Sequence, residues 1–169
     1  HALLKEIILP DTLLEIGDRA FQNCRRLHKV RIPSAVQRIG VRAFYGCDRL
    51  HISLEGKETL FGRDCFSETA TVHVSVMNPS KLPKVVQNSA ILAFAEDYIR
   101  QISMDTQFFM QCTKYIRNRR KLLYPIALQH WSLLQFLIQS KSIPLEDVSD
   151  LLEPLLLQDA SEAAAALLQ

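Results

Sequence analysis

The sequence is poor in glycine, and its few glycines are confined to the first part of the chain. Five glycines occur among 169 residues, and none lies beyond Gly62. Glycine destabilises helix interiors and is favoured in tight turns. We therefore expect turns in the first part of the chain. After Leu82 apolar residues recur at helical spacing, and there we expect helices.

Two further absences limit the class of protein. No apolar run approaches the roughly 18 residues that a membrane-spanning helix requires, so the sequence predicts no membrane span. The formal net charge is only +2, which gives no whole-chain argument for binding nucleic acid or an acidic membrane surface. With 48% hydrophobic residues, the chain is able to bury a core in one or two domains.

Motifs that would indicate catalysis or a bound metal are missing as well. The sequence has no Gly-x-Ser-x-Gly, no Gly-x-x-x-x-Gly-Lys and no His-Glu-x-x-His, and its carboxylates are scattered. We therefore expect no enzyme activity and no cofactor. The four cysteines lack Cys-x-x-Cys spacing. We expect them to be small buried apolar residues, with a Cys24–Cys47 bridge between neighbouring turns as the alternative.

What the sequence does contain is a repeat, whose units begin at Leu4, Leu27 and Leu50. Between the first two units, several slots recur at a spacing of 23: Pro10 and Pro33, Ile16 and Ile39, Gly17 and Gly40, Ala20 and Ala43, Phe21 and Phe44, Cys24 and Cys47. A third unit, one residue shorter, continues the pattern through Phe61, Gly62, Cys65 and Phe66. Because a unit of this length cannot bury its own apolar residues, the units must stack into a solenoid.

Each unit is expected to contain two extended pieces. In the second unit, Leu27-x-x-Val30-x-Ile32 alternates like a strand with one buried face, and Pro33 ends that strand. A second, shorter piece follows at residues 36–40. The shared glycine slot predicts a turn that side chains would obstruct, and the slot shared by Asn23 and Gly46 predicts a left-handed turn.

The pattern Leu-x-x-Val-x-Ile-Pro-x-x-Val-x-x-Ile-Gly-x-x-Ala-Phe-x-Gly-Cys, from Leu27 to Cys47, resembles the BspA-type leucine-rich repeat of bacterial proteins. The resemblance implies a leucine-rich-repeat β-solenoid of short parallel strands, with mostly extended structure on its convex side. We expect a repeat domain over residues 1–77, with units of about 4–26, 27–49 and 50–71 and a final strand at 72–76.

Residues 78–169 are expected to form an α-helical domain, so the predicted fold class is α+β by segregation: a strand ladder capped by a helical solenoid or bundle. The helical part would cover the open end of the ladder. Several BspA-type proteins of gut bacteria end in a similar region, with a Tyr-Ile-x-x-x-Arg/Lys-Lys-Leu-Leu run that is matched here from Tyr115 to Leu123.

Local signals place the expected helices. They are an N-cap at Ser80, a helix from about Val86 to Ile102, a second helix capped by Asp105, Pro125 in a first turn, and a helix from Pro144 to Leu152.

The outward residues of the strands are the candidate binding surface, because solenoids usually bind partners on their concave face. We expect a weakly basic patch that binds a protein or a glycan. The alternative is a solvated sheet surface without a ligand. The candidate residues are Lys5, Glu6, Ile8, Lys29, Arg31, His51, Ser53, His73 and Ser75.

Three histidines each follow a repeat phenylalanine by seven residues: His28, His51 and His73. Neighbouring rungs lie about 4.8 Å apart, so stacked histidines could share a metal ion. Because the third unit is shorter, we align Ile52 with Val74, which places only His51 and His73 in the same slot. Solvent-facing histidines are the favoured interpretation, and we assign no metal site.

A short basic run supplies the alternative function. Arg117, Arg119, Arg120 and Lys121 could bind phosphate or nucleic acid. The favoured interpretation is the last turn of a helix, where cations suit the helix dipole. We therefore predict a non-catalytic interaction module, with nucleic-acid binding or a purely structural cap as alternatives.

The chain begins at His1, inside a repeat, so we expect further repeats and any targeting signal to precede Leu4. Both the surface and the cytoplasm of a bacterial cell agree with this sequence.

Overall fold

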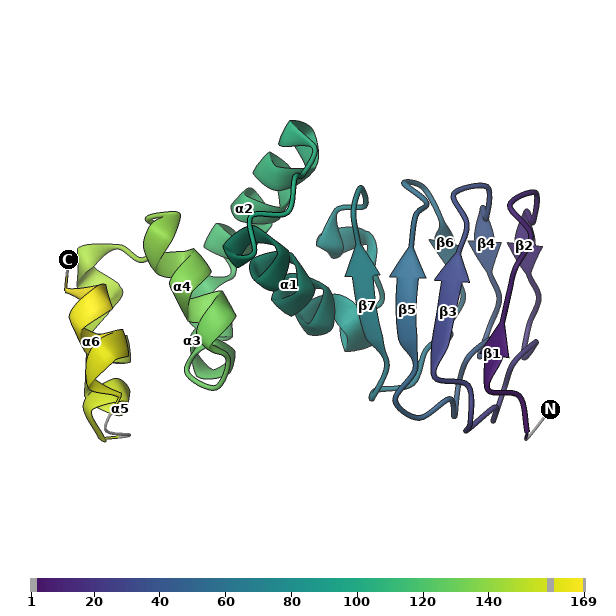
Figure 1. The fold of residues 1–169 in the computed structure, drawn as a ribbon, viewed down its shortest axis with the longest axis horizontal. Coiled ribbons are helices and arrows are strands. Elements are labelled where there is room, and N and C mark those ends of the chain that lie inside the picture. Colours follow the sequence, from purple (N-terminus) through teal and green to yellow (C-terminus); the bar gives the residue numbers. More distant parts are fainter. Residues whose placement is uncertain (1–2, 158–159, 169) are drawn as a thin grey trace.

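The computed structural model describes residues 3–157 and 160–168, and within them seven short strands form two parallel sheets (Figure 1). The four-stranded sheet has the order β1-β3-β5-β7, with strands β1 (Glu6–Ile7), β3 (Lys29–Ile32), β5 (His51–Leu54) and β7 (Thr71–Val74). The three-stranded sheet has the order β2-β4-β6, with strands β2 (Glu15–Ile16), β4 (Arg38–Ile39) and β6 (Leu60–Phe61). The first three turns each give one strand to each sheet, and the predicted β-solenoid is confirmed.

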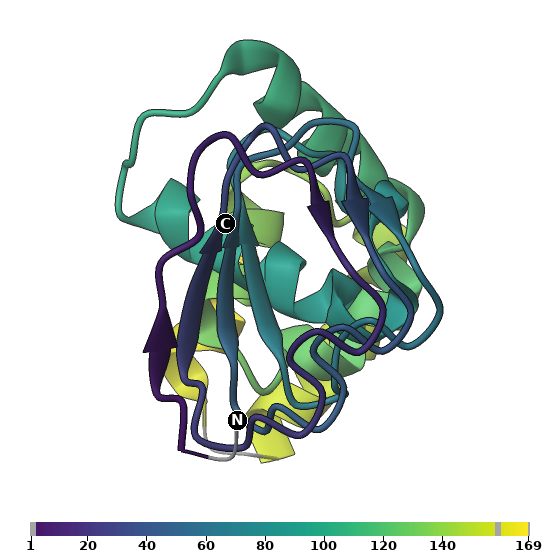
Figure 2. The ribbon, with the colours of Figure 1, turned by 90° about the vertical axis from the view of Figure 1, so that its right-hand side faces the viewer.

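The core of the ladder lies between the two sheets, which face one another in the end-on view of Figure 2. The alternating residues predicted to point inward are buried: Leu27, Val30, Ile32, Ile39, Leu50 and Ile52 are each at most 2% exposed. The repeat phenylalanines lie above one another as expected. The ring centroids of Phe21 and Phe44 are 5.1 Å apart, and those of Phe44 and Phe66 are 6.0 Å apart. Stacking of neighbouring turns therefore supplies the cover that a single turn lacks.

The glycine slot that recurs from turn to turn has the predicted steric cause. A Cβ added at Gly40 would lie 2.5 Å from the backbone nitrogen of Asp18, and one at Gly62 would lie 2.5 Å from the backbone nitrogen of Val41. The left-handed turn is also confirmed, because φ is 62° at Asn23 and 75° at Gly46.

The register of the last turn differs from the prediction. Strand β7 covers Thr71–Val74 rather than 72–76, and Ile52 lies opposite Val72 rather than Val74. Successive turns are thus offset by 23, then 22, then 20 residues in the four-stranded sheet. The phenylalanine and glycine slots recur at a spacing of 22 residues, but the strands β5 and β7 are only 20 residues apart.

The second half of the chain forms two short 3-10 helices and six α-helices in the described residues. They are η1 (Pro79–Lys81), α1 (Lys84–Ile99), α2 (Thr106–Asn118), α3 (Arg120–Ala127), α4 (Trp131–Gln139), η2 (Leu145–Asp147), α5 (Val148–Leu157) and α6 (Ser161–Leu167). The predicted segregation of strands and helices is confirmed.

Several helix boundaries were predicted wrongly, but one cap was right. Asn78, not Ser80, caps the first helical turn, because its side chain accepts the Ser80 N–H. The carboxylate of Asp105 accepts the N–H of Phe108 at 2.9 Å and caps α2 as expected. Pro125 lies inside α3 rather than in its first turn, and Pro144 precedes η2 rather than an α-helix.

Helix α1 covers the end of the four-stranded sheet and joins it to the other helices (Figure 1). The N–H of Val72, which faces away from the ladder, donates to the Ser89 hydroxyl of α1 at 3.0 Å. On the other side of α1, Phe94 packs against Phe108 and Phe136 with centroid distances of 5.8 and 5.2 Å. The predicted helical cap of the ladder is therefore present.

Among the described residues, no helix is long and apolar enough to cross a bilayer. All four cysteines are buried free thiols, so the alternative Cys24–Cys47 bridge is absent.

Candidate functional site

The outer face of the four-stranded sheet, here called the strand face, carries two columns of outward side chains. One column contains Glu6, Lys29, His51 and Thr71, and the other contains Ile8, Arg31, Ser53 and His73. The structure thus brings together seven of the nine predicted residues. Lys5 precedes β1 and Ser75 follows β7, and both are exposed beside the columns. Thr71 was missed because the predicted register of β7 was wrong.

Arg31 is neutralised by its own chain. Its guanidinium donates to both oxygens of Glu55, at 2.7 and 2.8 Å, and to Asp11 at 2.6 Å. These two carboxylates raise the pKa of Arg31 further above its ordinary value. Lys29 lies at the centre of the face and has no ion pair within the described residues, so the face carries a positive charge beside the paired charges of Arg31, Glu55 and Asp11.

A cavity of about 520 Å³ lies where the strand face meets α1, and we call it the corner cavity. Its apolar wall is formed by Leu92 and Ala93 of α1. Its polar groups come from three separate parts of the chain: Lys29, His51, Ser53, Thr71 and His73 from the strands, Glu96 from α1, and His130 from the loop before α4. Sequence reasoning placed Lys29, His51, Ser53 and His73 on this surface but not Thr71, Glu96 or His130, since no periodic signal joins the helical region to the strands.

The histidines do not form the predicted pair. His51 lies opposite Thr71, whose hydroxyl is 2.6 Å from its Nδ1, whereas His73 lies opposite Ser53. His73 instead pairs with Asp97 of α1, with 2.5 Å between Nε2 and the carboxylate. Within residues 3–157 and 160–168, no cluster of three or more His, Cys, Asp or Glu residues is arranged to hold a metal ion.

Ser53, His73 and Asp97 are neighbours, which raises the question of a catalytic triad. A serine nucleophile requires a hydrogen bond to its base and donors for an oxyanion. In the described part of the chain Ser53 makes no hydrogen bond to His73. The arrangement offers an imidazole that is hydrogen-bonded to a carboxylate at the edge of a cavity, which suits recognition of a polar side chain.

The basic run lies at the junction of two helices rather than in one last turn. Arg117 is in the last turn of α2, Arg119 lies between α2 and α3, and Arg120 and Lys121 begin α3. Arg117 donates to the Ser140 carbonyl at 2.7 Å and to the Ser142 hydroxyl at 3.1 Å. Among these four residues, only Arg119 has a side chain without a hydrogen bond or ion pair in the described part of the chain, and its guanidinium lies 5.2 Å from the ring centre of Tyr115.

Arg120 and Lys121 form ion pairs with a buried carboxylate, that of Asp147. Asp147 is 1% exposed and accepts hydrogen bonds from Arg120 at 2.9 Å and from Tyr124 at 2.7 Å, with the Lys121 ammonium 3.3 Å away. The hydrogen bond from Tyr124 and the two cations hold the pKa of Asp147 below its ordinary value, despite burial. These contacts favour a structural role for Arg120 and Lys121, which fasten η2 to α3.

Comparison with known proteins gives one match. The profile of the BspA type leucine rich repeat region matches residues 1–116 in six copies, which extends beyond the last strand and across α1 and α2. No curated protein and no solved structure matches the chain.

Proposed function

Because this chain belongs to the BspA-type leucine-rich repeat family, we propose that it is a non-catalytic module that binds a protein partner through the strand face and the corner cavity. Repeats of this family suggest a role in protein interaction and are typically non-enzymatic. The observation that carries the proposal is the corner cavity of about 520 Å³, where an exposed sheet surface meets a helix.

The chemistry of the corner cavity suits a side chain that is partly apolar and partly polar. Leu92 and Ala93 offer an apolar wall, while Lys29, Glu96 and the imidazoles offer charge and hydrogen bonds around it. Such a combination, with a few polar groups set around an apolar surface, is typical of sites that fix the orientation of an inserted group. A protein side chain held there would be anchored beside the two columns of the strand face.

Site-specific photo-crosslinking would test this proposal. A benzophenone amino acid is placed at Ser53, in the corner cavity, or at Glu153, which is exposed on α5. We expect a protein adduct from the Ser53 position, and a several-fold lower yield after Lys29→Glu. Equal yields from the Glu153 position, or a yield unaffected by Lys29→Glu, would refute binding at the strand face.

Nucleic-acid binding through the basic run is not our proposal, since Arg117, Arg120 and Lys121 are already engaged by the protein. A sharp test uses Arg119→Glu, because Arg119 is exposed and bears no salt bridge in the described residues. We expect no RNA or DNA retention at low salt and no effect of this variant. Retention that Arg119→Glu abolishes, with a steep dependence on salt, would support the alternative.

A further inference from the structure

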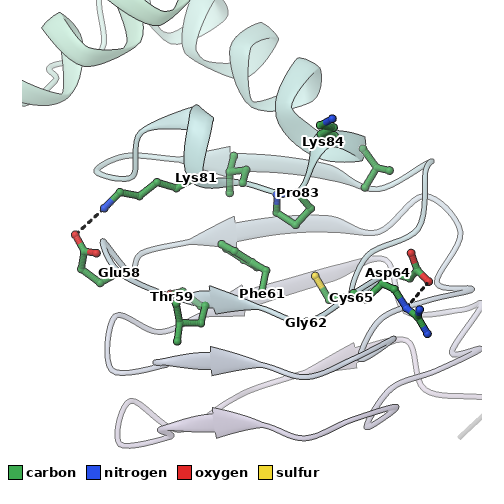
Figure 3. A pocket seen from close by; sticks show the side chains of 13 residues that line it. Glu58, Thr59, Phe61, Gly62, Asp64, Cys65, Lys81, Pro83 and Lys84 are labelled. Atoms are coloured by element: carbon green, nitrogen blue, oxygen red, sulfur yellow. Dashed lines mark hydrogen bonds and ion pairs between the residues drawn. The ribbon is translucent and has the colours of Figure 1, made fainter.

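A second surface lies at the edge of the three-stranded sheet, away from the strand face. The four-stranded sheet ends at β7, which α1 covers, whereas the three-stranded sheet ends at β6 and gains no fourth strand within the described residues. A cavity of about 630 Å³ lies against this edge, between β6 and residues 81–85, which lead into α1. Figure 3 shows Thr59 and Phe61 on the β6 side of this cavity and Lys81, Pro83 and Lys84 on the other.

The first two turns of the ladder show which backbone carbonyls of the third turn would accept hydrogen bonds from a fourth turn. Carbonyl oxygens at two slots accept N–H groups of the next turn at 2.7–2.8 Å: Leu14 from Gln37, Gln37 from Leu60, Ile16 from Gly40, and Ile39 from Gly62. By the register of β4 and β6, Thr59 and Phe61 occupy these two slots in the third turn. In residues 3–157 and 160–168, neither of their carbonyls receives a hydrogen bond.

A backbone donor is left unused in the same way. The N–H of Arg19 donates to the carbonyl of Val41 at 2.9 Å, and the N–H of Arg42 donates to that of Arg63 at 3.0 Å. Asp64 is the next residue in this series, and all three members have a φ between 54° and 57°. By this series the Asp64 N–H would donate to a fourth turn, and it has no acceptor in the described part of the chain. The edge thus offers two acceptors and one donor at the slots through which the earlier turns pair.

The chain's own segment on the far side of the cavity does not use these groups. Leu82 and Pro83 are extended, with ψ of 154° and 139°, and both line the cavity. Proline has no N–H, so Pro83 cannot donate to the Phe61 carbonyl. A proline beside a free sheet edge leaves the edge open to another strand while preventing closure by the chain itself.

The charges at the rim of the cavity favour an acidic occupant. Lys81 is paired with Glu58 at 2.8 Å, and Arg63 lies 3.8 Å from Asp64. Lys84 also lines the cavity and has no ion pair in the described residues, which leaves one uncompensated positive charge. A carboxylate on the occupant would neutralise it.

We propose that the edge of β6 binds an extended acidic peptide of a protein partner as a fourth, parallel strand of the three-stranded sheet. Main-chain hydrogen bonds from the peptide to Thr59 and Phe61 supply the affinity, as in other cases of strand addition. This surface is separate from the strand face, so the protein would have two contact regions on opposite sheets.

The chain itself supplies a probe for the experiment. A fluorescent peptide of residues 35–46, carrying Arg38→Glu and Arg42→Glu, reproduces the segment that pairs with the edge of β2. We expect saturable binding by fluorescence anisotropy. We also expect slower hydrogen exchange of the Asp64 amide, which becomes a donor in the complex.

Two matched controls report on the hydrogen bonds and on the charge. The same peptide N-methylated at Gln37 and Gly40, whose amides donate in the second turn, should bind at least about tenfold more weakly. Lys84→Glu in the protein should weaken binding, whereas Lys114→Glu, on the exposed side of α2, should leave it unchanged.

Three outcomes would overturn the proposal. They are absence of saturable binding, equal binding of the N-methylated peptide, and peptide-independent dimers in which the edges of two copies pair, which sedimentation would reveal. None of these outcomes depends on the crosslinking result at Ser53, so failure here is distinguishable from failure at the strand face.

Discussion

At the scale of single residues, glycines of neighbouring turns lie so close to the backbone of the turn before them that a Cβ would not fit. Gly40 lies against Gly17 and Asp18, and Gly62 lies against Gly40 and Val41. Gly17 belongs to the first described turn, and a Cβ added to it would meet nothing within 4 Å. A side chain in this slot would therefore clash with the preceding turn at Gly40 and Gly62 but not at Gly17.

This difference gives a prediction with a built-in control. Gly40→Ala places a methyl group 2.5–2.6 Å from backbone atoms of Asp18 and Gly17, so we expect it to lower the free energy of unfolding by about 2 kcal/mol. Gly17→Ala should change the free energy of unfolding by less than about 1 kcal/mol. Urea denaturation of both variants checks this, and equal effects of the two would contradict the steric account.

At the scale of elements, polar contacts fasten α1 to the strand that it covers and η2 to α3. Helix α1 caps β7 through the Ser89 hydroxyl, and η2 is held to α3 through Asp147. In both places a group that would otherwise be buried without a partner is satisfied, which is what makes the contact important for stability.

Loss of the Ser89 hydroxyl should leave the Val72 N–H without a partner at the covered end of the sheet. We expect Ser89→Ala to reduce the free energy of unfolding by about 1–3 kcal/mol. Asn88→Ala, at an exposed neighbouring position of α1, serves as the control and should change it by less than about 0.5 kcal/mol. Similar values for the two variants would show that the cap does not need this hydrogen bond.

The buried carboxylate of Asp147 makes stability depend on pH. Because its folded pKa lies below its ordinary value of 3.8, the unfolded chain takes up the proton first as the pH falls. The stabilisation is therefore complete at neutral pH and declines as the pH drops below 3.8 and through the folded pKa. Thermal unfolding at about pH 7 and about pH 3 should show a larger loss for the wild type than for Asp147→Asn. Asp150→Asn, at an exposed position, should behave like the wild type.

At the scale of the whole molecule, α1 couples the ladder to the helices, whereas α5 and α6 stand apart. Helix α1 packs on both β7 and α4, while α5 and α6 pack mainly on one another at the far end of the molecule (Figure 1). Their outer surface leaves Leu156 and Leu157 exposed. Segments with few contacts to the main core open more readily than the core itself.

Hydrogen exchange should reveal this hierarchy. We expect the amides of α5 and α6 to exchange faster than those of β5 and α1, which should be protected together because the same buried contacts hold them. Mass spectrometry of exchanged peptides would check the order. Equal protection of α6 and α1 would contradict it.

The ladder was predictable because its constraints repeat along the chain. Phe21, Phe44 and Phe66 lie one above another, so their spacing alone reports the stack. The last turn was not predictable, since the chain between Phe66 and Thr71 is shorter than in earlier turns and no repeated slot marks the loss. The strand columns were therefore found apart from Thr71, while the pairing of His51 with His73 was wrong.

Contacts among the helices could be predicted from the sequence even less well. Arg120 and Asp147 are 27 residues apart, and their contact is not repeated along the chain. No periodic pattern in the sequence therefore predicts it. The basic run was consequently interpreted as the last turn of one helix, whereas it spans the junction of α2 and α3. Likewise, the corner cavity depends on how α1 crosses β7, which is set by packing rather than by a motif.

The way in which backbone bonds join each turn to the next has an evolutionary consequence. A duplicate of residues 27–49 inserted after Arg49 would find the same carbonyl and amide partners below and above it, because the donors and acceptors of β3 and β4 recur at that spacing. Each duplication would add one rung, about 4.8 Å, to the outer surface. Recombination within the gene could thus change the length of the protein in whole-turn steps while the helical cap on β7 stays as it is.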